Sequence, residues 1–321
     1  MHNHDFVNAE KVKYRKLCKS EDTIPVYLRD WWLDAVCEQQ TWEVNLIEVD
    51  GKIIAAQPYI IKSKFGFKIV GTPLFTPFLG IWLRFPENQN YANKLAQEIE
   101  ISEKLIAKIP KCDYFNQGFS YEFTNWLGFY WNGYAQTTRY SYVIEDISDI
   151  DKVFNGFVKT KKTNIRKAQK IVDVKYDLPA KEFYDFHKTS LGKMGQKISY
   201  TFETFNRMHQ GAYENNAGRT IYAVDEHSNI HSALYFVWDK KCAYSIISAI
   251  DPNYNSSYSL SLLFFEAIRI SSLYVNKFDF EGSMIRSVEN SYRHFGGVQK
   301  PYFKISKINS KWLKFFMKWK S

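Results

Sequence analysis

Two stretches of the chain share one order of hydrophobic and polar positions. In the first, alternating apolar residues predict two strands joined by an Asp-Gly turn within residues 46–56, and a third strand at residues 68–71. In the second, the same alternation predicts strands at residues 221–225, 230–238 and 243–250. Each stretch is therefore expected to begin with three short, turn-connected strands.

An amphipathic helix and a further strand follow each set of three strands. Apolar residues at helical spacing predict helices over residues 91–109 and 258–273, and each is followed by an acid-aromatic strand, at residues 112–115 and 278–280. This order predicts a duplicated α/β unit with a mixed sheet flanked by helices. We place the boundary near residues 145–151, which gives domains at residues 1–147 and 148–321.

Composition agrees with a globular chain of this size. The 321 residues are 45% hydrophobic and 17% aromatic, which is enough for one large or two moderate cores. No stretch approaches the roughly 18 apolar residues of a spanning helix, and the first residues carry no apolar signal region, so we expect a cytoplasmic protein.

The spacing of the cysteines and the net charge indicate which kinds of ligand the chain binds. The four cysteines are scattered without a Cys-x-x-Cys pair and the histidines lack ligand spacing, so we expect reduced thiols and no metal site. The formal net charge of +9 favours an anionic partner, whether phosphates, nucleic acid or a membrane surface.

Two carboxylates follow the strand at residues 278–280. Strand alternation directs its phenylalanines into the core and places Asp279 and Glu281 on the opposite face. A carboxylate in a partly dry cleft is suited to removing a proton from an amine, which makes both residues candidate catalytic bases. The alternative is an ion pair with Arg286 or Arg293. Ser283 is expected to cap the helix that follows.

Two further segments are candidate phosphate sites. The loop after the strand ending at residue 250 leads into the helix at residue 258, whose free N–H groups suit a pyrophosphate; an ordinary turn capped by Asn255 or Ser256 is the alternative. The basic stretch 159–170 contains six charges of one sign and no acid, with Lys162 and Arg166 as candidate phosphate contacts. A solvated helix face is the alternative there.

Several of these segments together resemble a known family. Residues 278–283, the helix after them, Phe295-Gly296-Gly297 and the strand at residues 301–305 are similar to the C-terminal half of GNAT-like acyltransferases of the FemABX type. Residues 164–168 (Asn-Ile-Arg-Lys-Ala) resemble the helix that opens the family's second domain. The resemblance implies two tandem GNAT-like domains that share a cleft, and transfer of an acyl or aminoacyl group from a thioester or a tRNA ester to an amine.

The resemblance also suggests roles for residues. Asp279 or Glu281 would handle the proton. Apart from the resemblance, Tyr302 is a candidate proton relay, and a core residue is the alternative for it. The donor would lie against the following set: Ile250, Asn255, Ser256, Ser257 and Ser259. The loop lacks the family's glycines. In the Pro- and Gly-rich segment 71–82, Thr76 stands where peptidoglycan-acting members carry an acceptor-site carboxylate, so an ordinary strand connection is the alternative.

Three functions follow from these expectations. The first is N-acyl transfer from acyl-CoA to an amine of a small molecule, a sugar or a cell-envelope precursor, since the chain shows no coiled-coil arm of the kind seen in some aminoacyl-transferring members. The second is aminoacyl-tRNA-dependent transfer of the FemABX type to a peptidoglycan precursor. The third is a non-catalytic GNAT-like module that binds an anionic glycan or a nucleotide-linked ligand.

The C-terminal segment 307–321 adds a candidate surface. A helix capped by Ser310 would gather aromatic residues on one side and lysines in a stripe. It is expected either to close the second domain or to lie on the anionic inner face of a membrane, where it would bring the protein to a lipid-linked acceptor.

Overall fold

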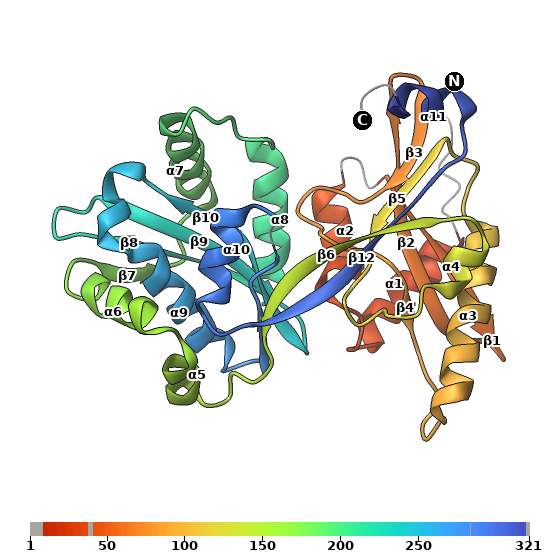
Figure 1. Cartoon of the computed structure of the whole chain (residues 1–321), viewed down its shortest axis with the longest axis horizontal. Helices are drawn as coiled ribbons and strands as arrows, with labels where there is room; N and C mark the ends of the chain where they lie inside the picture. Colours follow the sequence, from red (N-terminus) through yellow and green to blue (C-terminus); the bar gives the residue numbers. More distant parts are fainter. Residues whose placement is uncertain (1–8, 38–40, 283, 319–321) are drawn as a thin grey trace. The chain divides into compact units, whose positions relative to one another are not determined.

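The computed structural model describes residues 9–37, 41–282 and 284–318, and the chain divides into two compact units (Figure 1). Unit 1 comprises Met1–Arg139 and Pro301–Ser321, and unit 2 comprises Tyr140–Lys300. The expected division at residues 147 and 148 differs from this one mainly in assigning residues 301–321 to the second part. Among the described residues, no helix is both long enough and apolar enough to cross a membrane.

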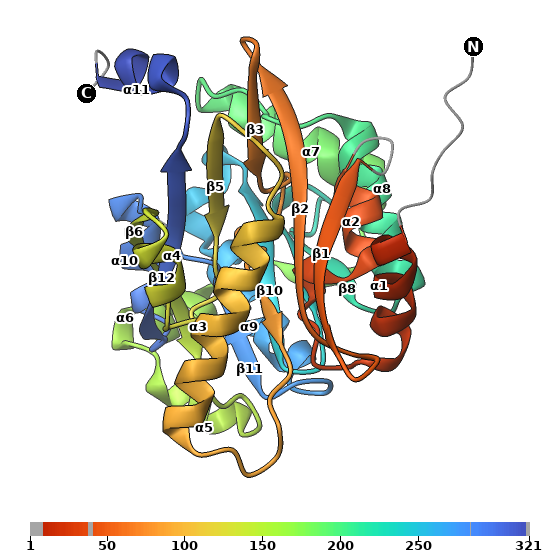
Figure 2. The same ribbon diagram turned by 90° about the vertical axis from the view of Figure 1, so that its right-hand side faces the viewer.

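Unit 1 is built on a mixed sheet with the strand order β1-β2-β3-β5-β12, and β4 pairs with β2 (Figure 2). β1, β2 and β3 form the expected antiparallel meander, and the β1–β2 turn has positive φ angles at Asp50 (49°) and Gly51 (74°). α3 then returns the chain so that β5 lies parallel to β3. The strands are β1 (Trp42–Val49), β2 (Lys52–Lys64), β3 (Phe67–Gly71), β4 (Trp82–Leu83), β5 (Tyr114–Gly118), β6 (Ala135–Ile144, which continues into unit 2) and β12 (Val298–Ile308, which begins in unit 2).

Helices α1 and α3 of unit 1 pack against β1 of this sheet. The 18 residues of α3 follow a cap in which the Asn90 side chain accepts from the Asn93 N–H, and the helix buries Ile101 and Leu105. The helices are α1 (Ala9–Ser20), η1 (Val26–Leu28), α2 (Asp30–Val36), α3 (Tyr91–Lys108), α4 (Leu127–Trp131) and α11 (Lys311–Lys318).

Unit 2 repeats the arrangement. Its strand order is β6-β11-β10-β9-β8-β7, in which β8, β9 and β10 form an antiparallel meander and α9 leads to β11, parallel to β10. The strands are β7 (Asp173–Tyr176), β8 (Gly218–Val224), β9 (Ile230–Trp238), β10 (Cys242–Ile250) and β11 (Lys277–Asp279). The helices are α5 (Ile150–Gly156), α6 (Lys159–Ala168), α7 (Ala180–Lys193), α8 (Phe202–Glu214), η3 (Pro252–Ser257), α9 (Ser259–Ser271) and α10 (Arg286–Arg293).

The two repeats exchange their last strands. β6 ends the first repeat, yet its residues 143 and 144 pair with β11 of unit 2. β12 ends the second repeat, yet its residues 304–308 pair with β5 of unit 1. Each sheet is therefore completed by a strand from the other half of the chain, which is why residues 301–321 belong to unit 1.

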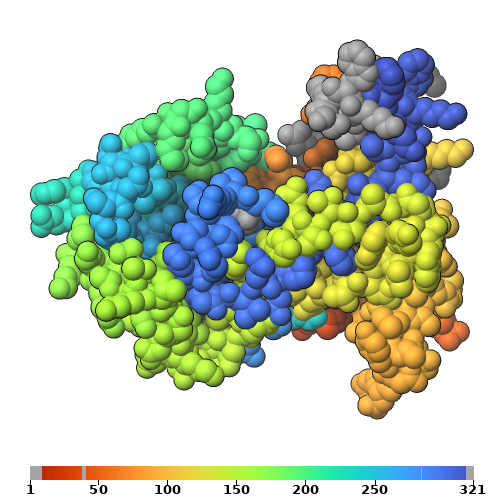
Figure 3. Space-filling model, in the orientation of Figure 1, coloured from red at the N-terminus to blue at the C-terminus, as the bar shows by residue number. Residues whose placement is uncertain are grey.

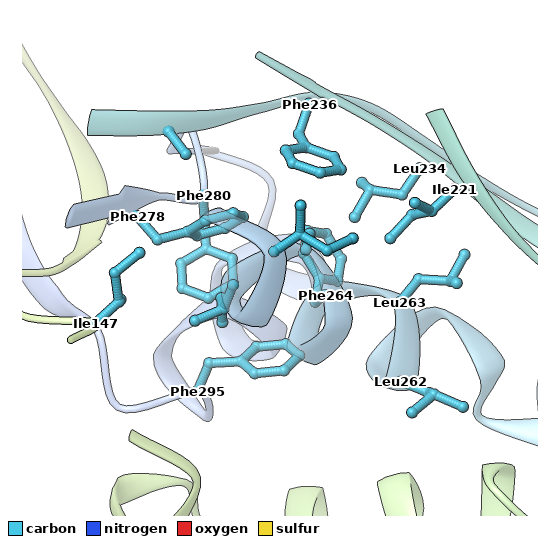
Figure 4. Packing of buried hydrophobic residues seen from close by; sticks show 14 of the residues in the cluster. Ile147, Ile221, Leu234, Phe236, Leu262, Leu263, Phe264, Phe278, Phe280 and Phe295 are labelled. Carbon is cyan, nitrogen blue, oxygen red and sulfur yellow. The ribbon is translucent and has the colours of Figure 1, made fainter. Parts of the chain in front are cut away.

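The core of unit 2 lies between its sheet and helix α9, and α5 and α6 add buried residues to it (Figure 4). Phe278 and Phe280 are fully buried in it, as strand alternation predicts. Phe280 stacks on Phe295 with the ring centroids 5.1 Å apart, and Phe264 of α9 contacts both rings. This aromatic cluster packs against the end of β11 on the side of the sheet that faces α9.

Candidate functional site

The backbone of unit 2 opens at one point between two strands. The parallel pairing of β10 with β11 covers three pairs and ends at Tyr244 and Asp279. β10 continues to Ile250 paired with β9 alone, after a bulge between Ser245 and Ile247. Among the described residues, no strand pairs with the other edge of residues 245–250, so its backbone N–H and C=O groups are available to a ligand.

Asp279 lies where the two strands part. Its carboxylate accepts hydrogen bonds from the Ser141 hydroxyl and from the Glu281 N–H (2.8 Å), and the residue is 1% exposed. Burial raises the pKa of Asp279 to about 6, against the lowering effect of those two hydrogen bonds. These contacts are not the ion pairs with Arg286 or Arg293 that were the alternative; Arg293 pairs with Glu289 at 3.2 Å.

Glu281 belongs to a tight turn and not to the strand. β11 ends at Asp279, and Glu281 has a left-handed conformation (φ 56°). The Gly282 N–H donates to the Ser141 hydroxyl at 3.0 Å, and a Cβ at this glycine would stand 1.5 Å from the Tyr140 carbonyl oxygen. Only glycine fits there. Asp279 and Ser141 thus hold the turn that presents the half-buried Glu281.

The helix after this turn starts later than expected. Ser283, the expected cap, lies outside the described residues, and α10 begins at Arg286 after Ile285 without a side-chain cap. α10 contributes Glu289, whose carboxylate accepts from the Tyr142 hydroxyl at 2.7 Å. Tyr142 in turn accepts from Gln299 at 2.7 Å, which ties β6, α10 and β12 together beside Asp279.

The expected donor loop leads to the N-terminus of α9, as the sequence suggested. The buried Ser257 hydroxyl accepts from the Ser259 N–H at 3.3 Å, and the Ser259 hydroxyl accepts from Ser232 at 2.8 Å. Tyr258, with φ 57°, occupies the cap position, so neither Asn255 nor Ser256 caps the helix; both are exposed on η3. Ile250 closes β10 opposite Ser232.

The basic stretch forms α6, which packs against α9 and η3. The two residues proposed as phosphate contacts face α5: the Lys162 ammonium donates to the Asn155 carbonyl at 3.0 Å, and the Arg166 guanidinium lies 5.4 Å from the Phe154 ring centroid. Lys167 instead lies over the Tyr258 ring at 5.7 Å, next to the start of α9. Positive charge therefore accompanies this helix N-terminus.

One lysine of α6 is buried, which its place in a basic run does not reveal. Lys161 is 8% exposed, donates to the hydroxyls of Ser261 and Ser291 at 3.3 Å each, and lies 4.2 Å from the Phe295 ring centroid. Burial lowers the pKa of Lys161 to about 8. The Lys161 side chain thus links α6 to α9 and α10 by hydrogen bonds and contacts the aromatic cluster through Phe295.

Two candidate residues lie in unit 1. Tyr302 is half-buried on β12, in the part of that strand that belongs to unit 1. Thr76 is 5% exposed, and its hydroxyl accepts from the Trp32 indole and donates to the Leu74 carbonyl, each at 3.0 Å. The Thr76 hydroxyl thus orders the loop around it.

The described residues contain no group of three or more His, Cys, Asp or Glu side chains placed to hold a metal ion. The groups that unit 2 offers for chemistry are the carboxylates of Asp279 and Glu281, the strand edge at residues 245–250 and the N-terminus of α9 with Lys167 beside it.

Comparison with known proteins bears on the fold. No protein-family model matches the chain, and no curated protein matches it. Among solved structures, FemX superimposes with a TM-score of 0.65 at 11% identity, covering 94% of this chain and 96% of FemX.

Two further solved structures are similar over nearly their full lengths. L-PGS from Bacillus licheniformis gives a TM-score of 0.56 at 10% identity, covering 97% of this chain and 95% of that one. The C-terminal domain of a putative lysylphosphatidylglycerol synthetase from Agrobacterium fabrum gives a TM-score of 0.54 at 10% identity, covering 93% of this chain and 92% of that domain. The expected mixed α/β fold and the resemblance to FemX are thereby confirmed at the level of the fold.

Proposed function

We propose that this chain is an N-acyltransferase that moves an acyl group from an activated donor to an amine, with the reaction at the opening between β10 and β11. The observation that carries the proposal is the coincidence of three features there: the unpaired edge of residues 245–250, the Asp279–Ser141 pair and the turn that presents Glu281. An acyl carbonyl aligned with the free edge would find backbone N–H groups for its developing negative charge.

The different burial of Glu281 and Asp279 leads to different proposed roles for the two carboxylates. Glu281 accepts the proton that the ammonium group of the acceptor loses, and the neutral nitrogen then attacks the acyl carbon. The bond from that carbon to sulfur or oxygen breaks, and the leaving group receives a proton. Asp279, which is 1% exposed and engaged by two donors, positions the turn. Tyr302 remains a predicted proton relay.

We assign the donor to acyl-CoA, with its phosphates at the start of α9. Lys167 beside Tyr258 and the dipole of α9 support an anion at this position, near Asn255, Ser256, Ser257 and Ser259. Lys162 and Arg166 remain predicted phosphate contacts. The acceptor is an amine of a small molecule, a sugar or a lipid-linked envelope precursor, and Thr76 remains a predicted substrate contact.

One observation favours a second candidate, aminoacyl transfer from tRNA. The loop 251–258 has no glycine, and the Ser259 N–H already donates to the Ser257 hydroxyl, which leaves less room and fewer donors for a pyrophosphate. FemX shares the fold of this chain with a TM-score of 0.65. A non-catalytic binding module would keep the fold without the chemistry.

Donor binding and transfer separate these three functions. Acetyl-CoA at about 100 times its dissociation constant should add roughly 2.7 kcal/mol to the free energy of unfolding, seen as a rise in melting temperature. Radiolabelled acetyl-CoA and radiolabelled aminoacyl-tRNA should then be compared as donors to a panel of amines. Stabilisation by acetyl-CoA with transfer supports the first function, and transfer from tRNA alone supports the second. Binding without transfer to any amine would support the module.

A further inference from the structure

One end of unit 1 exposes aromatic side chains among lysines. At the turn between β2 and β3, Phe65 is 89% exposed and has a left-handed backbone (φ 51°). On α11, Trp312 is 73% exposed and Phe315 is 56% exposed. Large apolar side chains this exposed need a reason when they gather in one place.

Strand register brings the turn and the helix to the same end of the sheet (Figure 2). Ile69, in the middle of the five-residue β3, is aligned with Tyr114 of β5, and Tyr114 is aligned with Ile308, where β12 ends. Asp113 links the two segments, because its carboxylate accepts from the Lys68 N–H and its carbonyl accepts from the Asn309 N–H, both at 2.8 Å. α11 starts two residues after Asn309 and projects from unit 1 at the upper right of Figure 3.

Lysines outnumber acidic residues around these aromatic side chains, and Asp113 is the acid that links the two segments. Residues 62–68 contain three lysines and residues 304–318 contain five, and neither segment contains an acidic residue. Lys64 lies over the Phe65 ring at 5.6 Å, and Lys311 and Lys314 are exposed beside Trp312 and Phe315. We call Lys64, Phe65 and Lys68 together with Lys311, Trp312, Lys314 and Phe315 the aromatic–lysine patch.

We propose that the aromatic–lysine patch docks the protein on an anionic phospholipid surface. Trp and Phe side chains insert at the level of the lipid head groups, while lysines bind the surface charge, with each lysine strengthening binding roughly fivefold. Lysine is depleted in the cores of protein–protein interfaces, so this composition does not fit a protein partner. An eight-residue helix is a weak anchor by itself, and Phe65 supplies the second point of insertion.

This docking is independent of the proposed acyl transfer, because none of the patch residues is among those assigned to the reaction above, and Asp279 and Glu281 lie in unit 2. The test is sedimentation of the full chain with vesicles of phosphatidylcholine alone and of an equal mixture of phosphatidylcholine and phosphatidylglycerol. We expect binding to the mixed vesicles, weakened by salt, and little binding to phosphatidylcholine alone.

Matched variants locate the surface. Lys311→Gln with Lys314→Gln should weaken binding roughly fivefold per lysine, whereas Lys188→Gln with Lys240→Gln, an equal change of net charge at exposed positions of unit 2, should not. Phe65→Ala with Trp312→Ala should lower binding further, and Tyr91→Ala with Leu273→Ala, two other exposed apolar positions, should leave it unchanged.

The melting temperature of every variant should be measured, so that a loss of binding is not confused with unfolding. The proposal is wrong if the intact chain binds no mixed vesicles, if control and patch variants lose binding equally, or if tRNA binds through the patch while vesicles do not.

Discussion

At the scale of single residues, the two carboxylates after β11 have different surroundings and therefore different expected roles. Asp279 is buried and accepts two hydrogen bonds, whereas Glu281 lies in a left-handed turn and is half-buried. Strand alternation placed both on one face, but it could not show that the strand ends at Asp279. A left-handed glutamate costs about 1 kcal/mol, which the bond from its N–H to Asp279 offsets.

Replacing each acid by its amide should distinguish these roles. Glu281→Gln should lower kcat by about 100-fold and leave the melting temperature unchanged, as expected for a lost proton acceptor. Asp279→Asn should lower both, because the turn loosens. Glu182→Gln, an exposed glutamate of α7, is the matched control. Near-native kcat in Glu281→Gln would remove Glu281 from the mechanism.

The buried Asp279 also predicts a pH effect on stability. Its pKa is raised from 3.8 to about 6 by burial, so between these values the unfolded chain releases a proton that the folded chain retains. Wild-type stability should therefore fall as pH rises from 4 to 6, by at most about 3 kcal/mol from this group.

Urea unfolding at several pH values measures this contribution. Asp279→Asn should become more stable relative to wild type as pH rises through that window. A stability difference that does not change with pH would show that Asp279 titrates normally.

At the scale of elements, α7 and α8 hold two histidines among aromatic rings. The His187 ring nitrogen lies 2.6 Å from the Tyr200 hydroxyl, and His209 stacks 4.4 Å from the Tyr213 ring. Burial lowers the pKa of each from 6.5 to about 4. Their neutral forms are therefore part of how these helices pack against β9.

These helices should weaken in acid. Below pH 6.5 the unfolded chain binds protons at both histidines that the folded chain does not bind until about pH 4. Proton uptake at each histidine should lower the free energy of unfolding by about 1–3 kcal/mol as pH falls through this window. The lower part of this range applies if solvent screens these partly solvated side chains.

The slope of unfolding free energy against pH is the readout. It should be shallower in His209→Gln than in wild type, and unchanged in His227→Gln, whose side chain is 75% exposed. Equal slopes in all three proteins would contradict the account.

Elements with a clear period could be predicted from sequence, and contacts that depend on distant partners could not. The strands at residues 230–238 and 243–250 and the helix at residues 91–109 are found within a few residues of their expected bounds. The burial of Lys161 depends on Ser261 and Ser291, which are 100 and 130 residues away, so its place in a basic run suggested a solvated charge. The bulge after Ser245 likewise has no local signal.

At the scale of the whole molecule, the exchange of β6 and β12 joins two repeats that sequence order alone separates. Both strands follow a helix and carry aromatic residues, and nothing in their local pattern says which sheet they complete. Their pairing is settled by partners more than a hundred residues away along the chain, since Phe278 aligns with Ile144 and Ile308 with Tyr114.

The exchange predicts that neither half folds alone. Residues 1–147 lack β12, and residues 148–321 lack β6, so β5 in one fragment and β11 in the other each lose the strand that pairs with them. Each should be insoluble or lack a cooperative thermal transition, and co-expression should recover a soluble complex. A cooperative transition in either isolated fragment would contradict this role of the exchanged strands.

The central claim is that an acyl donor binds along the free edge of β10 and the start of α9. Hydrogen exchange of the full chain with acetyl-CoA, and separately with aminoacyl-tRNA, tests it directly. The account predicts that one of these donors slows exchange of backbone amides in residues 245–262, with Glu281→Gln showing the same protection as wild type. Protection confined to other segments, or none with either donor, would contradict the claim.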